Sequence, residues 1–212
     1  QVYMRYRHIQ CGYATSLYND RSANNYSING SRPCASGSHN AVQINYQRAV
    51  SKHVTLGIGI EKPDVSYTPA LPAEAVGNTG DNVNQRIPDI PIYVNYGWGE
   101  TNHVRLSAVL RNISYYNNVK DENNTVTGWG LKLTGSYSLH PLDFCYTVQG
   151  GHGIANYMVG TRDRMLDLVP YNDPERGELR ATDSFGFIAG AQYNINPKVF
   201  VSGQFSWMRN FI

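Results

Sequence analysis

Apolar and polar side chains alternate along several segments of this chain, and this alternation limits the fold more than any other feature. In the segment VRLSAVLR at 104–111, apolar residues occupy every second position. A period of two over such lengths is typical of strands in a sheet with one apolar and one polar face. The pattern predicts nine strands, near residues 2–9, 41–48, 54–61, 90–98, 103–113, 127–139, 142–153, 183–194 and 198–209.

The connections between the predicted strands alternate in length. Short turns are expected at 49–53, 99–102, 140–141 and 195–197, whereas longer segments rich in Asn, Ser, Asp, Pro and Gly occupy 10–40, 62–89, 114–126 and 154–182. Long structureless loops are unusual in a compact soluble domain. Short turns on one side and long loops on the other are typical of a transmembrane barrel. We therefore predict an all-β fold, a transmembrane antiparallel β-barrel forming one domain over 1–212, with the four long segments as extracellular loops.

The odd number of predicted strands suggests that the barrel extends beyond this sequence. Bacterial single-chain barrels have an even number of strands, and an open sheet edge in lipid would leave backbone groups without partners. We therefore expect the chain to be a fragment of a larger barrel, with strands missing at one or both ends. The first residues, QVYMRYRHIQ, read as a strand and not as a signal peptide, so an exported protein would appear here in mature or truncated form.

The composition agrees with a membrane barrel. Charged residues make up 16% of the chain, below the roughly 25% of a typical soluble domain. The 16 tyrosines outnumber the 6 phenylalanines, which suits strands whose aromatic rings lie at a membrane–water boundary. A net charge of +2 does not favour nucleic acid as a partner. The chain has no apolar run of about 18 residues, which excludes transmembrane helices.

If the apolar residues face lipid, the alternate positions face the lumen, and most charges there are basic. The predicted lumen cations are Arg5, Arg7, Arg105, Arg111 and Lys132. A cationic wall in a narrow pore attracts anions, although these groups could instead be solvated or pair with loop carboxylates. Two further arginines, Arg21 and Arg32, lie in the segment 10–40. That segment could fold into the lumen as a constriction loop or cover only the outer rim.

Other residue clusters give weaker signals. Cys11 and Cys34 flank a long polar segment and are candidates for a disulfide in an oxidising compartment, whereas Cys145 lies in a predicted strand and is expected to be buried. The histidines lack metal-ligand spacing. The glycine-rich segment 150–153 has no following Lys and helix, as a P-loop would have. We therefore predict no catalytic site, no metal and no cofactor.

Four ordered segments resemble the DcaP-like family of trimeric outer-membrane porins. They are HVRLSAVLRNISYYNN, GWGLKLTGSYSL, QGGHGIANYM and FGFIAGAQYNINPKVFVSGQFSWMRN, within 41–211. The resemblance implies a 16-stranded barrel in the bacterial outer membrane, a homotrimer, and a channel for small anionic solutes such as dicarboxylates. The arginine-bearing strand of that family corresponds here to Arg105 and Arg111. The cysteines depart from the family pattern.

The sequence as a whole predicts an outer-membrane porin, a passive channel for small hydrophilic and anionic solutes. Its partners would be outer-membrane lipid and further copies of the chain. Three alternatives remain open at this point: a soluble or surface-exposed carbohydrate-binding β-sandwich, an outer-membrane barrel enzyme, and a non-conducting barrel used for adhesion or peptidoglycan attachment.

Overall fold

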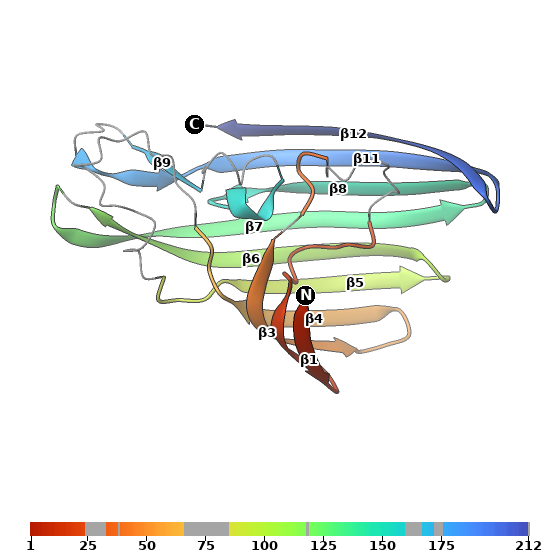
Figure 1. Cartoon of the computed structure of the whole chain (residues 1–212), viewed down its shortest axis with the longest axis horizontal. Coiled ribbons are helices and arrows are strands. Elements are labelled where there is room, and N and C mark those ends of the chain that lie inside the picture. The colour runs from red at the N-terminus through yellow and green to blue at the C-terminus, as the bar shows by residue number, and fades with distance from the viewer. Residues whose placement is uncertain are drawn as a thin grey trace.

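The computed structural model describes residues 1–23, 33–37, 39–65, 85–117, 119–159, 167–171 and 176–211. A ten-stranded antiparallel sheet, in which each strand pairs with its neighbours along the chain, dominates these residues (Figure 1). Its strands are β1 (Val2–Tyr6), β2 (Ile9–Thr15), β3 (Asn40–Ala49), β4 (Val54–Glu61), β5 (Ile90–Trp98), β6 (Asn102–Asn117), β7 (Glu122–Leu139), β8 (Leu142–His152), β11 (Asp183–Asn196) and β12 (Val199–Phe211).

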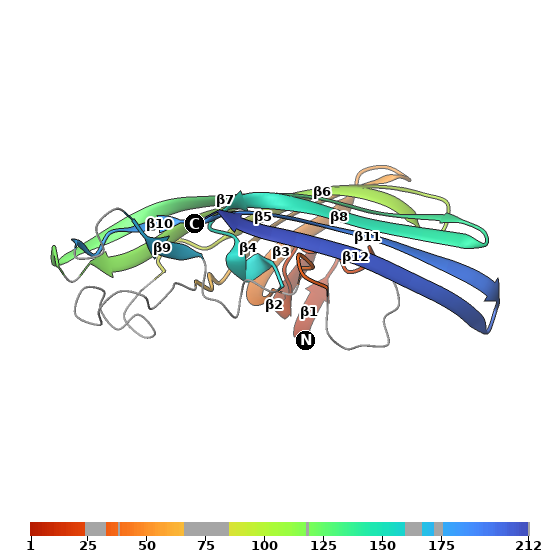
Figure 2. The same ribbon diagram turned by 90° about the horizontal axis from the view of Figure 1, so that it is seen from above.

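The smaller elements all lie on one side of this sheet. Within the described residues they are the 3-10 turn η1 (Ala155–Tyr157) and the two-stranded sheet of β9 (Leu168–Pro170) and β10 (Leu179–Ala181). Figure 2 shows the ten strands as an arc, with η1, β9 and β10 on its concave side. No helix among the described residues is long and apolar enough to cross a membrane.

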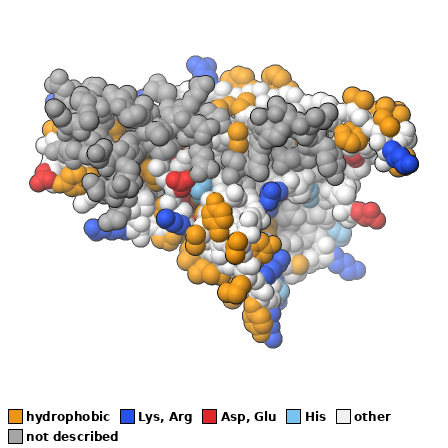
Figure 3. All heavy atoms as spheres, in the orientation of Figure 1, with side chains coloured by type: hydrophobic (Ala, Val, Ile, Leu, Met, Phe, Trp, Pro, Cys, Tyr) orange, Lys and Arg blue, Asp and Glu red, His pale blue; other side chains and the backbone are white. Residues whose placement is uncertain are grey.

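The two faces of the sheet differ as the alternation predicts. On β6, Leu106 and Leu110 are 53% and 58% exposed on the convex face, whereas Ser107 and Val109 are each 1% exposed on the concave face. Apolar residues stay exposed on the convex face because no described segment covers it. In Figure 3, apolar side chains also gather over the lower part of the molecule, where β1 and β3 lie. The expected antiparallel sheet with one apolar and one polar face is therefore confirmed.

The predicted strand at 2–9 is wrong, because these residues form two strands. The chain turns at Arg7 and His8, and Arg7 adopts a left-handed φ of 51°. This turn pairs Tyr6 with Ile9, so β2 uses residues that were assigned to a long loop. Arg and His are not typical turn residues, and the alternation reads through them without a break. The main sheet consequently has ten strands, not nine.

The long loop predicted at 114–126 is also wrong. β6 and β7 remain paired as far as Asn117 opposite Glu122, which leaves only a short connection between them. The large apolar residues of the convex face end near Leu110 and Trp129, and the strands continue beyond them with Asn, Tyr and Thr. The extension lacks large aliphatic side chains on the convex face, so a reading based on alternation missed it. The four predicted short turns, between β3 and β4, β5 and β6, β7 and β8, and β11 and β12, are confirmed.

The buried core lies between the concave face and the segments folded onto it. One cluster joins Val109 and Ile188 of the sheet to Tyr18, Ile154, Tyr157 and Met158. A second cluster joins Ile113 and Tyr115 to Leu168, Leu179 and Ala181 of β9 and β10. In a soluble β-sandwich the core would lie under the convex apolar face, and there the described residues leave it uncovered.

Candidate channel lining

The segment that follows β2 crosses the concave face. The Tyr18 hydroxyl donates a hydrogen bond to the Leu131 carbonyl oxygen on β7 at 3.1 Å. Further along, the Cys34 thiol lies 3.1 Å from the Ser206 hydroxyl on β12, and Gln149 on β8 donates to the Ala35 carbonyl oxygen. The described parts of this segment, 16–23 and 33–37, therefore lie against the concave face and not at an outer rim. We call these two parts the inward segment.

Asp20 is the main polar anchor of the inward segment. Its carboxylate lies 2.8 Å from His103 Nε2 and accepts a hydrogen bond from the Thr134 hydroxyl at 2.7 Å. Ser22 donates to the other carboxylate oxygen at 2.5 Å. Burial alone would raise the pKa of Asp20, but these hydrogen bonds and the nearby Arg105 charge hold it below its usual range. Nothing in the local sequence SLYND signals the contact with the sheet, because His103 and Thr134 lie more than 80 residues away.

Arg105 lies where the inward segment meets the sheet. Its guanidinium carbon is 3.7 Å from the centre of the Tyr93 ring, and the guanidinium donates to the Leu17 carbonyl oxygen. It borders a polar hollow of about 330 Å³ that Asp20 and Arg21 also line. Arg105 and Arg21 are thus brought together beside open space.

Arg111, in contrast, is enclosed. Its Nε lies 3.0 Å from Asp89 Oδ2 and its Nη1 lies 3.0 Å from Asp167 Oδ1, and all three side chains are at most 1% exposed. The Tyr157 hydroxyl donates to Asp89 at 2.9 Å, and Arg111 Nη2 donates to the Asp64 carbonyl oxygen at 2.6 Å. Arg111 therefore connects β6 to the segments before β5 and after η1, and a solute could not reach it without disrupting these contacts.

The remaining predicted cations have different surroundings. Lys132 is 2% exposed, donates to Asn19 Oδ1 at 3.0 Å, and lies under the Tyr18 ring. Arg5 is exposed on β1 opposite Gln10, which lines the same hollow as Arg105. Arg7 lies in the turn after β1 and not on a strand. Arg32 lies outside the described residues.

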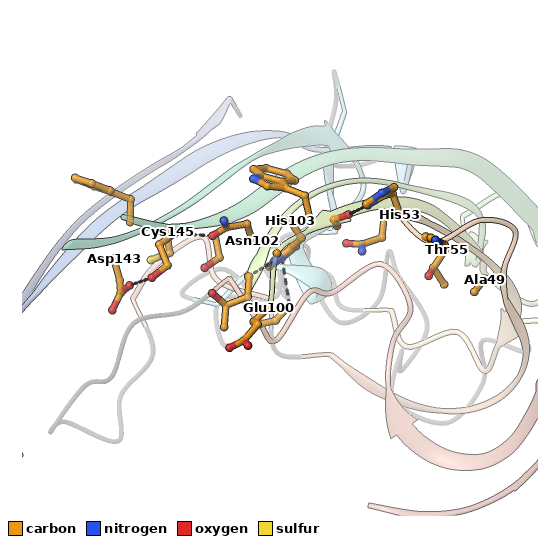
Figure 4. A pocket seen from close by; sticks show the side chains of 18 of the residues that line it. Ala49, His53, Thr55, Glu100, Asn102, His103, Asp143 and Cys145 are labelled. Atoms are coloured by element: carbon orange, nitrogen blue, oxygen red, sulfur yellow. Dashed lines mark hydrogen bonds between the residues drawn. The ribbon is translucent and has the colours of Figure 1, made fainter. Parts of the chain in front are cut away.

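A larger polar hollow of about 880 Å³ lies at the short-turn end of the concave face. Most side chains that line it are neutral and polar, among them Thr55, Asn95, Asn102, Ser136, Ser138 and Gln192. His103 and Asn102 lie side by side at its centre in Figure 4, with Glu100 on the preceding turn. The sequence did not indicate this hollow, since its lining comes from β3 to β8, from β11, from two short turns and from Ser22, which only the folded chain brings together.

The disulfide considered between Cys11 and Cys34 is not formed, and all three cysteines are free thiols. Cys11 is exposed on the convex face, between Met4 and Ile44, whereas Cys34 lies on the concave side next to Ser206. The sheet separates the two sulfur atoms. Cys145 is buried on β8, as predicted. Among the described residues, no group of three or more His, Cys, Asp or Glu is arranged to hold a metal ion.

These features together define a class of fold. Long antiparallel strands expose an apolar convex face, carry polar side chains on the concave face, and are joined by short turns at one end. This is the construction of a transmembrane β-barrel wall, in which lipid covers one face and the other lines the interior.

The comparison with solved structures agrees. The chain is similar to the crystal structure of the outer membrane channel DcaP of Acinetobacter baumannii, with a TM-score of 0.77 and 18% sequence identity. The alignment covers 99% of this chain and 55% of that channel, so the chain spans about half of the channel's length. The resemblance inferred from the sequence is thus confirmed for the fold. No family model matches the sequence, and no curated protein matches it.

Proposed function

We propose that this chain forms part of the wall of an outer-membrane channel and that its inward segment forms a constriction. Small hydrophilic solutes, preferentially anions, would diffuse passively through this channel. The observation that carries the proposal is the ten-stranded sheet itself, with an exposed apolar convex face and a polar concave face onto which the inward segment folds. Its fold is similar to that of an outer membrane channel. We place the solute on the polar side of the sheet, where the two polar hollows lie.

The proposed preference for anions rests on a smaller set of cations than the sequence suggested. Arg105 and Arg21 border the hollow of about 330 Å³. Arg5 lies on β1, opposite Gln10, which lines the same hollow. Asp20, which lies beside them, also contacts His103 and Thr134. Basic side chains beside a polar path raise the local concentration of anions. Arg111 and Lys132 are assigned a structural role because they are buried beneath the inward segment and η1.

The orientation, assembly and solute class complete the proposal. The short turns would face the periplasm and the long loops the exterior, which is the usual arrangement of outer-membrane barrels. The family resemblance suggests a homotrimer and dicarboxylate-like solutes. The mass of the purified protein in detergent tests the homotrimer. Inhibition of the chloride current by added dicarboxylates tests the solute class.

Ion selectivity in planar bilayers tests the function. Under a KCl gradient the protein should conduct with a reversal potential whose sign indicates that chloride is more permeant than potassium. Arg105→Gln should shift this potential toward the value expected for a cation-selective channel. Arg48→Gln is the matched control, because Arg48 is exposed on the outer side of β3 and is equally charged. A reversal potential unchanged by Arg105→Gln would refute the anion assignment. Protein that is correctly folded but never conducts would instead favour the non-conducting barrel.

A further inference from the structure

The convex face contains an apolar hollow beside Gly150. In the sheet register Gly150 lies between Leu131 on β7 and Phe185 on β11, so a position without a side chain separates two large ones. The resulting hollow measures about 450 Å³, and its apolar lining also includes Trp129, Val148 and Phe211. A Cβ atom added at Gly150 would lie 3.1 Å from Phe185 Cδ2, so a larger side chain at this position would fill the hollow.

Charged side chains lie on the same face at the end of the hollow nearest the long loops. His152 Nδ1 lies 2.7 Å from Asp183 Oδ1, one row beyond Gly150 in the register. Arg209 faces Phe185 across the β11–β12 pair, and its guanidinium carbon lies 5.1 Å from the Phe211 ring. Asp183 is thus paired with His152, while Arg209 forms no ion pair with any carboxylate in the described part of the chain.

The depth of these charges indicates their surroundings in a membrane. Asp183 begins β11, His152 ends β8, and Arg209 is two residues from the end of β12. An arginine on the lipid face of a barrel is unfavourable at the bilayer midplane and nearly neutral at the interface. Trp129, exposed beside the hollow, belongs to a residue type that concentrates at headgroup level. The row of His152 and Asp183 therefore matches the headgroup layer, and the hollow lies on its hydrocarbon side. Arg209 belongs to the same row as Gly150, and its guanidinium lies near Phe211 of the His152–Asp183 row.

We propose that the Gly150 hollow and Arg209 form a binding site for a phosphorylated, acylated lipid of the leaflet on the long-loop side. An acyl chain would occupy the hollow between Leu131 and Phe185, and a headgroup phosphate would pair with the Arg209 guanidinium. Arg–phosphate pairing is among the stronger charge-assisted contacts. This inference rests on the proposed membrane placement but does not require conduction.

Retention of lipid A by the folded protein in detergent tests the site. Native mass spectrometry should detect one bisphosphorylated lipid A molecule on the unmodified protein. Gly150→Leu should reduce this retention at least tenfold, because the side chain fills the hollow. Arg209→Gln should remove the preference for bisphosphorylated over dephosphorylated lipid A.

Two control variants separate the site from general effects. Gly203→Leu adds the same bulk on β12, where a Cβ atom would meet nothing within 4 Å, and Arg48→Gln removes an exposed cation on β3. Both should retain lipid A as the unmodified protein does. Equal retention by Gly150→Leu and Gly203→Leu would overturn the proposal. So would a change of oligomeric mass in Gly150→Leu, which would make the hollow a contact between copies.

Conductance provides an independent measurement. Gly150→Leu and Arg209→Gln should both conduct as the unmodified protein does, since neither residue is assigned to the channel lining. Lipid retention without conduction would refute the proposed channel and leave this site standing. Conduction with no selective lipid retention would refute this site and leave the proposed channel standing.

Discussion

Replacement of Asp20 by Asn should release the inward segment from the sheet. The Asp20 carboxylate accepts hydrogen bonds from Thr134 and Ser22 and contacts His103 at 2.8 Å. Asparagine keeps the shape, but its amide nitrogen would face one of these donors and the negative charge would be lost. A hydrogen bond to a charged group contributes about 1.5–3 kcal/mol. We therefore expect the free energy of opening of residues 16–23 to fall by about 2 kcal/mol.

Hydrogen exchange measured by mass spectrometry can detect this change. A loss of about 2 kcal/mol corresponds to exchange roughly 30-fold faster for peptides covering 16–23. Asp143→Asn is the matched control, because Asp143 accepts hydrogen bonds from Ser138 and Asn194 near the short turns and does not contact the inward segment. Equal exchange in Asp20→Asn and the unmodified protein would refute the reasoning.

The pH dependence of the same contact has a definite sign. The pKa of Asp20 is lower in the folded protein than in the unfolded chain. Its contribution to stability is therefore fully present above the ordinary Asp pKa of about 4 and is lost only as pH falls through the lowered value. Protection of 16–23 should consequently persist from pH 7 to pH 5. A loss of protection within that range would show that Asp20 is not the anchor.

Three further predictions concern the interior and the cysteines. Arg111→Gln leaves Asp89 and Asp167 buried without their counter-charge, so the free energy of unfolding in detergent should fall by about 3–5 kcal/mol. Replacement of the exposed Arg180 by Gln should have little effect. Equal denaturation midpoints for Arg111→Gln and the unmodified protein would contradict this prediction. In Gly57→Ala the added Cβ atom would overlap Tyr93 Cε1 and displace the ring beneath Arg105, so the reversal potential should shift. Gly97→Ala, whose added Cβ atom makes only ordinary contacts, should leave the reversal potential unchanged. All three thiols should be alkylated in denaturant without reductant, and an alkylation count of one would indicate a disulfide.

Much of the sheet could be predicted from sequence because burial on a two-faced sheet has a period of two. The segment 104–111 shows this most clearly, since Leu106 and Leu110 are exposed whereas Ser107, Val109 and Arg111 are buried. The prediction failed where that physical rule does not apply. Arg7 takes a left-handed conformation that no local signal indicates, and residues 114–117 and 122–126 extend past the large apolar residues of the convex face.

The interior could be predicted less well, because alternation assigns a face and not a neighbour. Arg105 and Arg111 occupy the same face six residues apart, yet one borders a hollow and the other is enclosed by two carboxylates. The difference comes from Asp89 and Asp167, which lie 22 and 56 residues from Arg111. Such pairings depend on how the inward segment and η1 fold onto the sheet, which no strand pattern encodes.

The path of the inward segment has a mechanical consequence. One described part contacts Leu131 on β7 and the other, through Cys34, contacts Ser206 on β12, so the two parts contact strands far apart along the arc. Such contacts help to hold these strands at a set separation. The width of the interior and the position of Arg105 are then set by the same contacts. A substitution that weakens the contacts of the inward segment should therefore reduce the curvature of the sheet and widen the channel. Conductance and ion selectivity would then change together.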